Sequence, residues 1–247
     1  MTPNNSLING EILTSTGDLF QLGFFSLDSS SAKGYIGIWY CNHTPQEGSV
    51  VWIANRNKSV NTSMASFNLT SDGNLVLFEE DKIVWSTGTR STELNSARLQ
   101  LLESGNLVLN DSNYILWQSF EHKNESGMYL VGMKFGFDNR ANTSWQLVSW
   151  KNPLDPSPGD YIMMIRALPI PDDVTMKGAD IYYRGGAYGT DMTSPTPVLF
   201  RSVLCANGTF QAWFLNRGGK GEWQILWSLP EDECDTYNRC GRNSVCT

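Results

Sequence analysis

Long apolar runs, clustered positive charge and histidine are all scarce in this sequence. Of its 247 residues, 18 are Lys or Arg against 25 that are Asp or Glu, giving a net charge of −7, and two are His. No stretch approaches the roughly 18 apolar residues that a membrane-spanning helix needs, and the polar start lacks the apolar core of a signal peptide. The sequence therefore predicts a soluble piece of protein. Without a basic patch, neither nucleic acid nor anionic lipid is an expected partner.

The groups that catalysis or metal binding requires are also sparse. His43 and His122 are not spaced with another His or Cys as a metal pair, and no Gly-x-Ser-x-Gly motif occurs. The segment 218–221 lacks the Ser or Thr of a phosphate loop, so we interpret it as a hairpin turn. We interpret Asp172 and Asp173 as solvated loop charges. A glycosidase would need two carboxylates that face each other across a cleft, and the sequence leaves open that such a pair arises by chance. We expect no catalytic residue, no metal and no cofactor.

What is abundant favours β-structure. The chain has 22 Gly, 9 Trp, 9 Tyr and 11 Phe, and only 17% of its residues are charged. This composition favours short strands and turns over long helices. The length allows one large or two ordinary domains with a sizeable core, and we expect two.

Asn-x-Ser/Thr acceptors for N-linked glycans are unusually many. None of them has Pro in the middle position. The nine acceptors are Asn4, Asn42, Asn57, Asn61, Asn68, Asn110, Asn124, Asn142 and Asn207. So many acceptors in one chain predict a secreted, glycosylated surface.

The five cysteines are unevenly placed. Cys234, Cys240 and Cys246 follow a C-x5-C-x5-C spacing near the end, whereas Cys41 and Cys205 stand alone. The spacing lacks the C-x2-C pairs of zinc sites, so it predicts a truncated disulfide module. Because five is odd, at least one cysteine has no partner within this chain.

A repeat of about 32 residues is the strongest internal pattern. Its parts are Gly73-Asn74-Leu75-Val76-Leu77 with Ile83-Val84-Trp85, and Gly105-Asn106-Leu107-Val108-Leu109 with Ile115-Leu116-Trp117. In both copies the Trp follows the Gly by 12 residues, and Trp52 precedes Trp85 by 33, which implies a third copy opened by the hairpin around Gly17. Each copy predicts a turn, a strand, a polar tip and a strand ending at Trp.

Three such small sheets cannot bury a face alone. We therefore expect them to pack around a shared axis as a threefold β-prism, with Trp52, Trp85 and Trp117 filling the middle rather than binding ligand. Beyond Phe120 the period fades, and residues 151–160 read as a long turn within a second β domain. Strands of that domain are expected at Trp145–Trp150, Tyr161–Arg166, Ile181–Tyr183, Thr209–Leu215 and Trp223–Trp227.

Several motifs resemble a known family. They are Gln21-Leu22-Gly23-Phe24-Phe25, Tyr35-Ile36-Gly37-Ile38-Trp39-Tyr40, Val50–Asn57, Leu116-Trp117-Gln118-Ser119-Phe120, Gly132–Gly136, Ser149-Trp150-Lys151 and Pro156-Ser157-Pro158-Gly159-Asp160. In this order they resemble S-locus glycoproteins and plant G-type lectin S-receptor-like serine/threonine kinases. The resemblance implies an all-β fold: a bulb-type lectin domain at 1–122, a second lectin-like β-prism domain at 123–229 and the truncated start of an EGF-like module at 230–247.

The resemblance also implies a function. The intact protein would continue into a PAN-type domain, one membrane helix and a cytoplasmic kinase, so the chain would be a non-catalytic ectodomain on the extracellular face of the plasma membrane. Its implied ligand is an extracellular peptide or microbial molecule, with a receptor homodimer and pollen recognition or plant defence as the context. A disulfide between Cys234 and Cys246 is implied as well, which leaves Cys240 for a partner outside this piece.

The bulb-type lectins that this sequence resembles bind mannose with a strand of the pattern Gln-x-Asp-x-Asn-x-Val-x-Tyr. The matching positions in the second repeat are Thr70, Asp72, Asn74, Val76 and Phe78. In the third they are Leu102, Ser104, Asn106, Val108 and Asn110, and in the first they are Thr14, Thr16, Asp18, Phe20 and Leu22. No copy is complete, and each missing hydrogen bond costs about 1–3 kcal/mol. We therefore expect a degenerate mannose site in which the two asparagines stabilise turns, with a glycan on Asn68 shading what remains.

Two alternatives stay open. The chain could be a working lectin for mannose-type glycans, which binding to mannose would reveal. It could also belong to a secreted glycoprotein without a kinase, which the complete reading frame would reveal.

Overall fold

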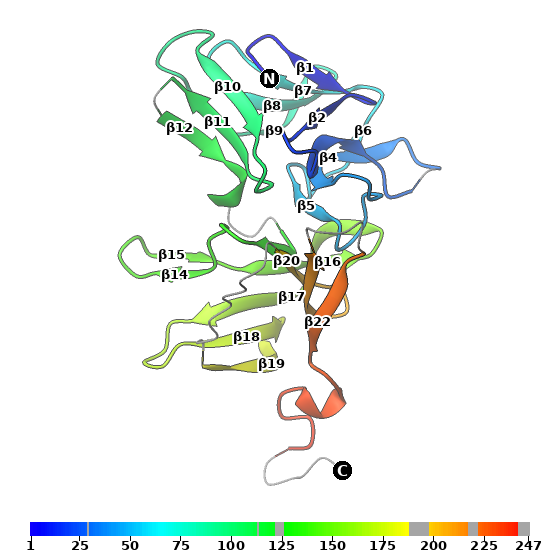
Figure 1. Ribbon diagram of the computed structural model, residues 1–247, viewed down its shortest axis with the longest axis vertical. Helices are drawn as coiled ribbons and strands as arrows, with labels where there is room; N and C mark the ends of the chain where they lie inside the picture. Colours follow the sequence, from blue (N-terminus) through cyan, green and yellow to red (C-terminus); the bar gives the residue numbers. More distant parts are fainter. Residues whose placement is uncertain (29, 113, 122–125, 188–197, 217–221, 242–247) are drawn as a thin grey trace. The chain divides into compact units, whose positions relative to one another are not determined.

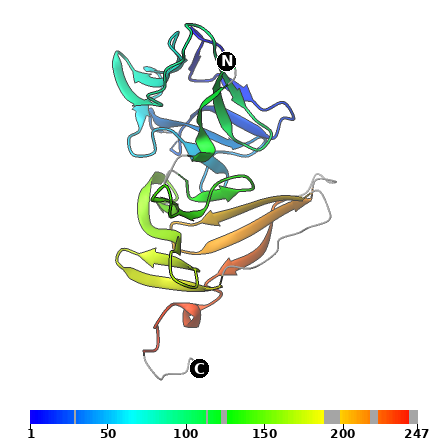
Figure 2. The ribbon, with the colours of Figure 1, turned by 90° about the vertical axis from the view of Figure 1, so that its left-hand side faces the viewer.

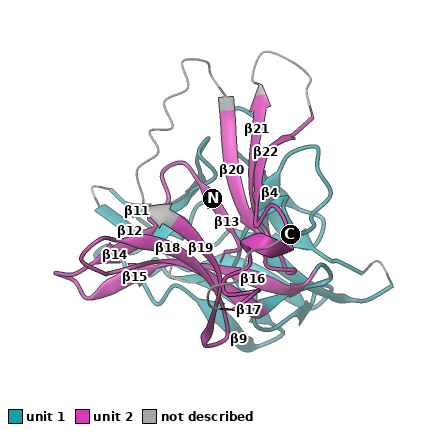
Figure 3. Ribbon diagram, turned by 90° about the horizontal axis from the view of Figure 1, so that it is seen from below, with its two compact units in different colours: residues 1–125, 153–157 teal, residues 126–152, 158–247 magenta. Residues whose placement is uncertain are grey.

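The computed structural model describes residues 1–28, 30–112, 114–121, 126–187, 198–216 and 222–241. The chain divides into two compact units, which Figure 3 draws in two colours. Unit 1 is Met1–Glu125 with Pro153–Ser157, and unit 2 is Ser126–Asn152 with Pro158–Thr247. Each unit is described below by itself.

Unit 1 is built from strands. They are β1 (Ser6–Ile8), β2 (Ile12–Thr14), β3 (Phe20–Phe25), β4 (Lys33–Tyr40), β5 (Val50–Ile53), β6 (Val60–Asn61), β7 (Ala65–Leu69), β8 (Leu75–Glu79), β9 (Lys82–Ser86), β10 (Ala97–Leu101), β11 (Leu107–Asp111) and β12 (Tyr114–Gln118). The strands are followed by a single 3₁₀ turn, η1 (Ser119–Glu121).

Three antiparallel sheets make up unit 1, one for each repeat. The orders are β2-β3-β4-β5 with β6 on β4, β1-β7-β8-β9, and β10-β11-β12. The first sheet is blue, the second mainly cyan and the third green in Figures 1 and 2. In the second sheet, β1 from the start of the chain pairs with β7 and adds a strand to the repeat. The three sheets predicted from the repeat are confirmed.

A tryptophan cluster, Trp52, Trp85 and Trp117, joins the three sheets. Each pair meets edge to face, with ring centroids 5.6–5.9 Å apart and interplanar angles of 64–78°. Trp52 is 3% exposed, Trp117 is also buried, and Trp85 is half-buried. Edge-to-face rings at this separation gain electrostatic attraction beyond their buried area. The predicted structural role of these indoles is confirmed.

The turn that opens each later repeat needs glycine. Gly73 has φ +81° and Gly105 has φ +84°, in the region that only glycine adopts without strain. At Gly73 a Cβ would also lie 2.7 Å from Cβ of Ser91. The recurring Gly of the Asp-Gly-Asn and Ser-Gly-Asn turns is therefore required by the backbone.

Unit 2 is also built from strands. They are β13 (Met128–Leu130), β14 (Gly136–Asp138), β15 (Thr143–Trp145), β16 (Leu147–Asn152), β17 (Asp155–Arg166), β18 (Asp172–Lys177), β19 (Asp180–Ala187), β20 (Val198–Leu204), β21 (Phe210–Asn216) and β22 (Gln224–Leu229). The first three residues of β17 belong to unit 1. They form two four-stranded sheets, β16-β17-β18-β19 and β13-β20-β21-β22, and the hairpin β14-β15. The long strands β20 and β21 are side by side in Figure 2. A short 3₁₀ turn, η2 (Glu233–Asp235), follows.

The all-β fold class predicted from the sequence is confirmed, but the strand pattern of unit 2 was only partly predicted. The prediction of a long turn at 151–160 is wrong, because β17 begins at Asp155 and includes Pro156 and Pro158. The expected strand Trp145–Trp150 is divided between β15 and β16. The sequence pattern did not reveal β13, β14, β18 or β20.

Asp172 and Asp173 correct a second expectation, since both lie on β18 and neither is in a loop. Asp172 is 5% exposed and pairs across the sheet with Arg166 on β17. Arg166 donates to both carboxylate oxygens at 2.9 and 2.6 Å, and Arg184 on β19 donates at 2.7 Å. These hydrogen bonds, led by that of Arg166, lower the pKa of Asp172 to about 2.

This lowered pKa makes unit 2 sensitive to acid. Because the folded pKa lies below the ordinary value of about 3.9, the stabilisation is present above pH 4 and is lost as pH falls toward 2. We expect Asp172→Asn to lower the urea midpoint at pH 7 and to lose that difference near pH 2. Asp180→Asn, an exposed control on β19, should change neither value. An equal deficit of Asp172→Asn at both pH values would contradict this account.

Candidate functional site

The residues that match the family's sugar-binding strand lie at the start of the second repeat's hairpin. Thr70 and Asp72 belong to the turn between β7 and β8, and Asn74 directly precedes β8. Val76 and Phe78 lie on β8 itself. The structure therefore brings these five residues into one short segment.

In that segment the polar side chains bond to the turn. The hydroxyl of Thr70 donates to Asp72 Oδ1 at 2.6 Å and accepts from the Asn74 backbone N–H at 3.1 Å. Asn74 Oδ1 accepts from Thr87 Oγ1 at 2.9 Å and from the Gly88 backbone N–H at 3.0 Å. An oxygen that already accepts two hydrogen bonds has its lone pairs occupied. The amide oxygen of Asn74 is thus committed to holding β8 against the end of β9.

The third repeat uses its asparagine in the same way. Asn106 is 8% exposed, and its Oδ1 accepts from Ser119 Oγ and from the Phe120 N–H, both at 3.2 Å. Its Nδ2 donates to Gln118 Oε1 at 2.8 Å. Both ends of the amide are bonded inside the protein, so Asn106 fastens β11 to β12.

Two hydroxyls complete these networks, and sequence reasoning did not single them out. Thr87 Oγ1 accepts from the Leu75 N–H at 3.1 Å, and Ser119 Oγ accepts from the Leu107 N–H at 2.9 Å. Both hydroxyls stand two residues after the repeat tryptophan. Extending the repeat by two positions would have found them. In the first repeat the residue two positions after the tryptophan is Ala54, which has no hydroxyl. The next residue, Asn55, accepts a backbone hydrogen bond there, from the Ile36 N–H to its Oδ1 at 2.9 Å.

The valine of the sugar motif is buried in both later repeats. Val76, whose methyl groups would contact the ring, is 2% exposed, and Val108 in the third repeat is buried as well. Asn68 lies directly across β7–β8 from Val76, so a glycan there would emerge beside this position. Both valines are therefore packed inside the protein.

The first repeat replaces the asparagine with a serine turn. Ser15 Oγ accepts from the backbone N–H groups of Leu19 and Phe20 at 3.2 and 3.1 Å. Asp18, at the motif's Asn position, has φ +55° within the turn. Phe20, at the Val position, is buried. This copy thus has a turn without a sugar-binding amide.

Two carboxylates at equivalent repeat positions hold the linkers between sheets. Glu79 on β8 accepts from the Asn61 N–H at 2.6 Å, and Asp111 on β11 accepts from the Thr92 N–H at 3.2 Å. Hydrogen bonds from the hydroxyl of Ser91 first, and then from Ser96 and Thr92, lower the pKa of Asp111 to about 2. These acidic groups act as structural acceptors.

Most of the glycan acceptors that the structure describes are open to solvent. The exposed ones are Asn4, Asn42, Asn57, Asn110, Asn142 and Asn207. Asn61 and Asn68 are half-buried. Asn124 lies outside the described residues. His122, considered above as a catalytic group, also lies outside them.

The cysteines are distributed over both units. Cys234 is disulfide-bonded, and Cys246, its implied partner, lies outside the described residues. Cys41 at the end of β4 is half-buried, and burial raises the pKa of its thiol. Thr236 pairs with Tyr183, and the Tyr237 N–H donates to the Tyr182 carbonyl at 2.8 Å. The segment after Pro230 is therefore joined to the edge of β19.

Neither a metal centre nor a membrane helix was found in the described part of the chain. Within those residues, no three His, Cys, Asp or Glu side chains gather as metal ligands. The described segments likewise contain no helix with the length and apolarity to span a bilayer.

Two family models match the chain in succession. Residues 49–151 match the D-mannose binding lectin model, and residues 187–247 match the S-locus glycoprotein domain model. The chain thus combines a lectin-type segment with an S-locus-type segment.

Curated relatives cover the chain from end to end. It is 34% identical, over its whole length, to the G-type lectin S-receptor-like serine/threonine-protein kinase SD1-1 of Arabidopsis thaliana, and 29% identical, over 98% of its length, to the kinase RKS1 of the same plant. The chain spans 34% and 32% of the length of these relatives. It therefore corresponds to about a third of each.

Two solved lectins were also found. A monomeric mannose-binding lectin from Gastrodia elata is 20% identical, with a TM-score of 0.37, over 48% of this chain and 94% of that one. The two-domain fetuin-binding agglutinin of Scilla campanulata is 16% identical, with a TM-score of 0.33, over 92% of this chain and 81% of that one. The fold assignment rests on the strands and the tryptophan cluster, since scores this low add no argument.

Proposed function

We propose that this chain, which belongs to the family of plant S-locus-type ectodomains with a bulb-type lectin domain, is the extracellular ligand-recognition region of a receptor-like kinase and is itself non-catalytic. Its ligand would be an extracellular peptide or a microbial molecule, and ligand binding would promote receptor pairing. The kinase relatives support this assignment, since the chain corresponds to about a third of their length. In the complete reading frame we expect a PAN-type domain, one membrane helix and a serine/threonine kinase. A stop codon soon after an EGF-like module would indicate the secreted form instead.

The lectin domain, in this proposal, is a scaffold whose mannose site has degenerated. The observation that carries the proposal is the use of Asn74 and Asn106 inside the fold, with Val76 covered. Two further groups of the sugar motif are missing, because Thr70 and Phe78 stand where the motif has Gln and Tyr. Each polar group that a sugar hydroxyl fails to reach costs about 1–3 kcal/mol, which a monosaccharide cannot recover elsewhere.

Calorimetric titration with methyl α-mannoside tests this part of the proposal. We expect no binding tighter than about 1 mM, which corresponds to roughly −4 kcal/mol. The double variant Thr70→Gln/Phe78→Tyr restores both missing side chains and should still not bind, because Val76 stays covered. A monocot mannose lectin titrated in parallel is the positive control.

The outcomes separate the alternatives. Sub-millimolar binding by the natural chain would favour a functional mannose lectin and overturn the scaffold proposal. Binding by the double variant alone would mean that side-chain loss, and not burial, closed the site.

A further inference from the structure

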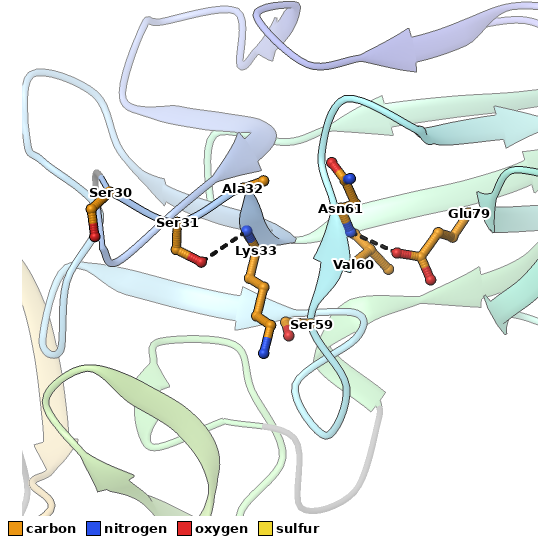
Figure 4. Close-up of a pocket in the computed structure, with 8 residues that line it drawn as sticks. All are labelled: Ser30, Ser31, Ala32, Lys33, Ser59, Val60, Asn61 and Glu79. Carbon is orange, nitrogen blue, oxygen red and sulfur yellow. Dashed lines mark hydrogen bonds between the residues drawn. The ribbon is translucent and has the colours of Figure 1, made fainter.

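A pocket on unit 1 lies at one of the half-buried glycan acceptors. It has a volume of about 500 Å³, within the range of small-ligand pockets. Figure 4 shows its lining side chains, which come from the loop before β4 and the first residue of β4, from β6 and the residue before it, and from the end of β8. They are Ser30, Ser31, Ala32, Lys33, Ser59, Val60, Asn61 and Glu79. This pocket does not include the sugar-motif residues Thr70–Phe78.

The lining has the chemistry of a site for a hydroxylated ring. Three serines and one lysine offer hydrogen-bond donors and acceptors, while exposed Ala32 offers a small apolar surface. Ser30 Oγ donates to Asp28 Oδ1 at 2.6 Å, and Ser31 Oγ accepts from the Lys33 N–H at 3.1 Å, so each hydroxyl keeps part of its bonding capacity. An N-acetyl sugar, with hydroxyls, an acetamide and an apolar ring face, matches this mixture.

Asn61 lies in this pocket's wall in a fixed orientation. Its N–H donates to Glu79 at 2.6 Å, and across the β4–β6 pair it stands opposite Lys33. Its Oδ1 accepts from the Ser63 N–H at 3.1 Å, which identifies that atom as the oxygen. Among the described residues, no hydrogen bond occupies its Nδ2, the atom to which a glycan is joined. Asn61-Thr62-Ser63 is a complete acceptor.

We propose that Asn61 carries an N-linked glycan whose first N-acetylglucosamine occupies this pocket. Because Asn61 is half-buried, the first ring cannot project freely as it can from exposed Asn207. The covalent bond holds the ring at a high effective concentration beside the pocket, so weak individual contacts suffice to fill it. The glycan then stabilises the end of the β3–β4 loop and closes this surface to soluble ligands. The inference depends on the extracellular location proposed above, because the glycan is added in the secretory pathway.

Secretion from a plant or insect cell line, followed by glycopeptide mass spectrometry, gives the occupancy of each acceptor. Hydrogen–deuterium exchange then compares the natural chain with Ser63→Ala. This variant abolishes the acceptor but keeps Asn61 and the backbone N–H at position 63, so the hydrogen bond that orients Asn61 is retained. Asn207→Gln is the matched control, since Asn207 Oδ1 likewise accepts from the Thr209 N–H, at 3.0 Å, but is exposed.

We expect Asn61 to be occupied and the backbone of 30–33 and 59–63 to exchange roughly tenfold faster in Ser63→Ala than in the natural chain. Asn207→Gln should leave exchange at 30–33 and 59–63 unchanged. Trimming to one N-acetylglucosamine should preserve the protection, because only the first ring enters the pocket. A bare Asn61 beside an occupied Asn207, or equal exchange with and without the glycan, would overturn this inference alone. Bare asparagines throughout would overturn it together with the extracellular location.

Discussion

Replacing Trp52 with alanine should destabilise unit 1 by about 3–5 kcal/mol, the range for removing a buried tryptophan. Trp52 is 3% exposed and contacts the other two indoles of the tryptophan cluster at 5.6 and 5.7 Å. The substitution removes two of the three indole contacts that join the sheets and leaves a cavity where they meet. Native-state hydrogen exchange of β8 and β11 measures the loss within unit 1 without assuming that both units unfold together.

Two variants control this experiment. Trp52→Phe keeps an aromatic ring and should lose less than half as much stability as Trp52→Ala. Ile83→Ala changes a side chain that is 63% exposed, two residues before Trp85, and should stay within about 0.5 kcal/mol of the natural chain. If Trp52→Ala costs less than about 1 kcal/mol, the tryptophan cluster does not hold the three sheets together.

Replacing Asn106 with alanine should also destabilise unit 1, even though its motif position is that of a sugar ligand. The change leaves the Phe120 N–H and the Gln118 side chain without their Asn106 partner, at about 1–3 kcal/mol for each buried group left unsatisfied. Thermal unfolding of non-glycosylated protein from bacteria is the measurement. Asn110→Ala changes an exposed asparagine on β11, the strand that Asn106 precedes, and should change the midpoint little.

The two roles of Asn106 predict opposite results. A structural asparagine lowers stability when it is removed and leaves sugar binding unchanged. An Asn106→Ala chain that unfolds like the natural one but has lost measurable affinity for mannose would show that the residue is a ligand.

Unit 1 could be predicted from sequence because its constraints recur at a fixed spacing. Each later repeat needs a glycine with positive φ at its turn and a tryptophan at its end, so Gly73, Gly105, Trp85 and Trp117 stand out. The degenerate motif was visible for the same reason. The partners of Asn74 and Asn106 were not, because Thr87 and Ser119 are 13 residues away and have no distinctive side chain.

Unit 2 was harder because its strands lack this regularity. Pro156 and Pro158 favoured a turn in the sequence-based prediction. They are tolerated in β17 because its pairing with β18 begins only at Tyr161, so neither proline has to donate a hydrogen bond to β18. Asp172 follows Pro171 and reads as a loop charge when only its neighbours are considered. Its burial depends on Arg166 and Arg184, which the sheet brings from other strands. Tertiary pairing of this kind overrides local propensity.

The most direct test of the central claim is to follow the side-chain amide signals of Asn74 and Asn106 by nuclear magnetic resonance while methyl α-mannoside is added. If these asparagines fasten the repeats of a scaffold, their signals will stay in place up to about 10 mM sugar, a tenfold excess over a 1 mM dissociation constant. Shifts of either amide that saturate below 1 mM would contradict the account, because they would place mannose on the residues assigned here to the fold.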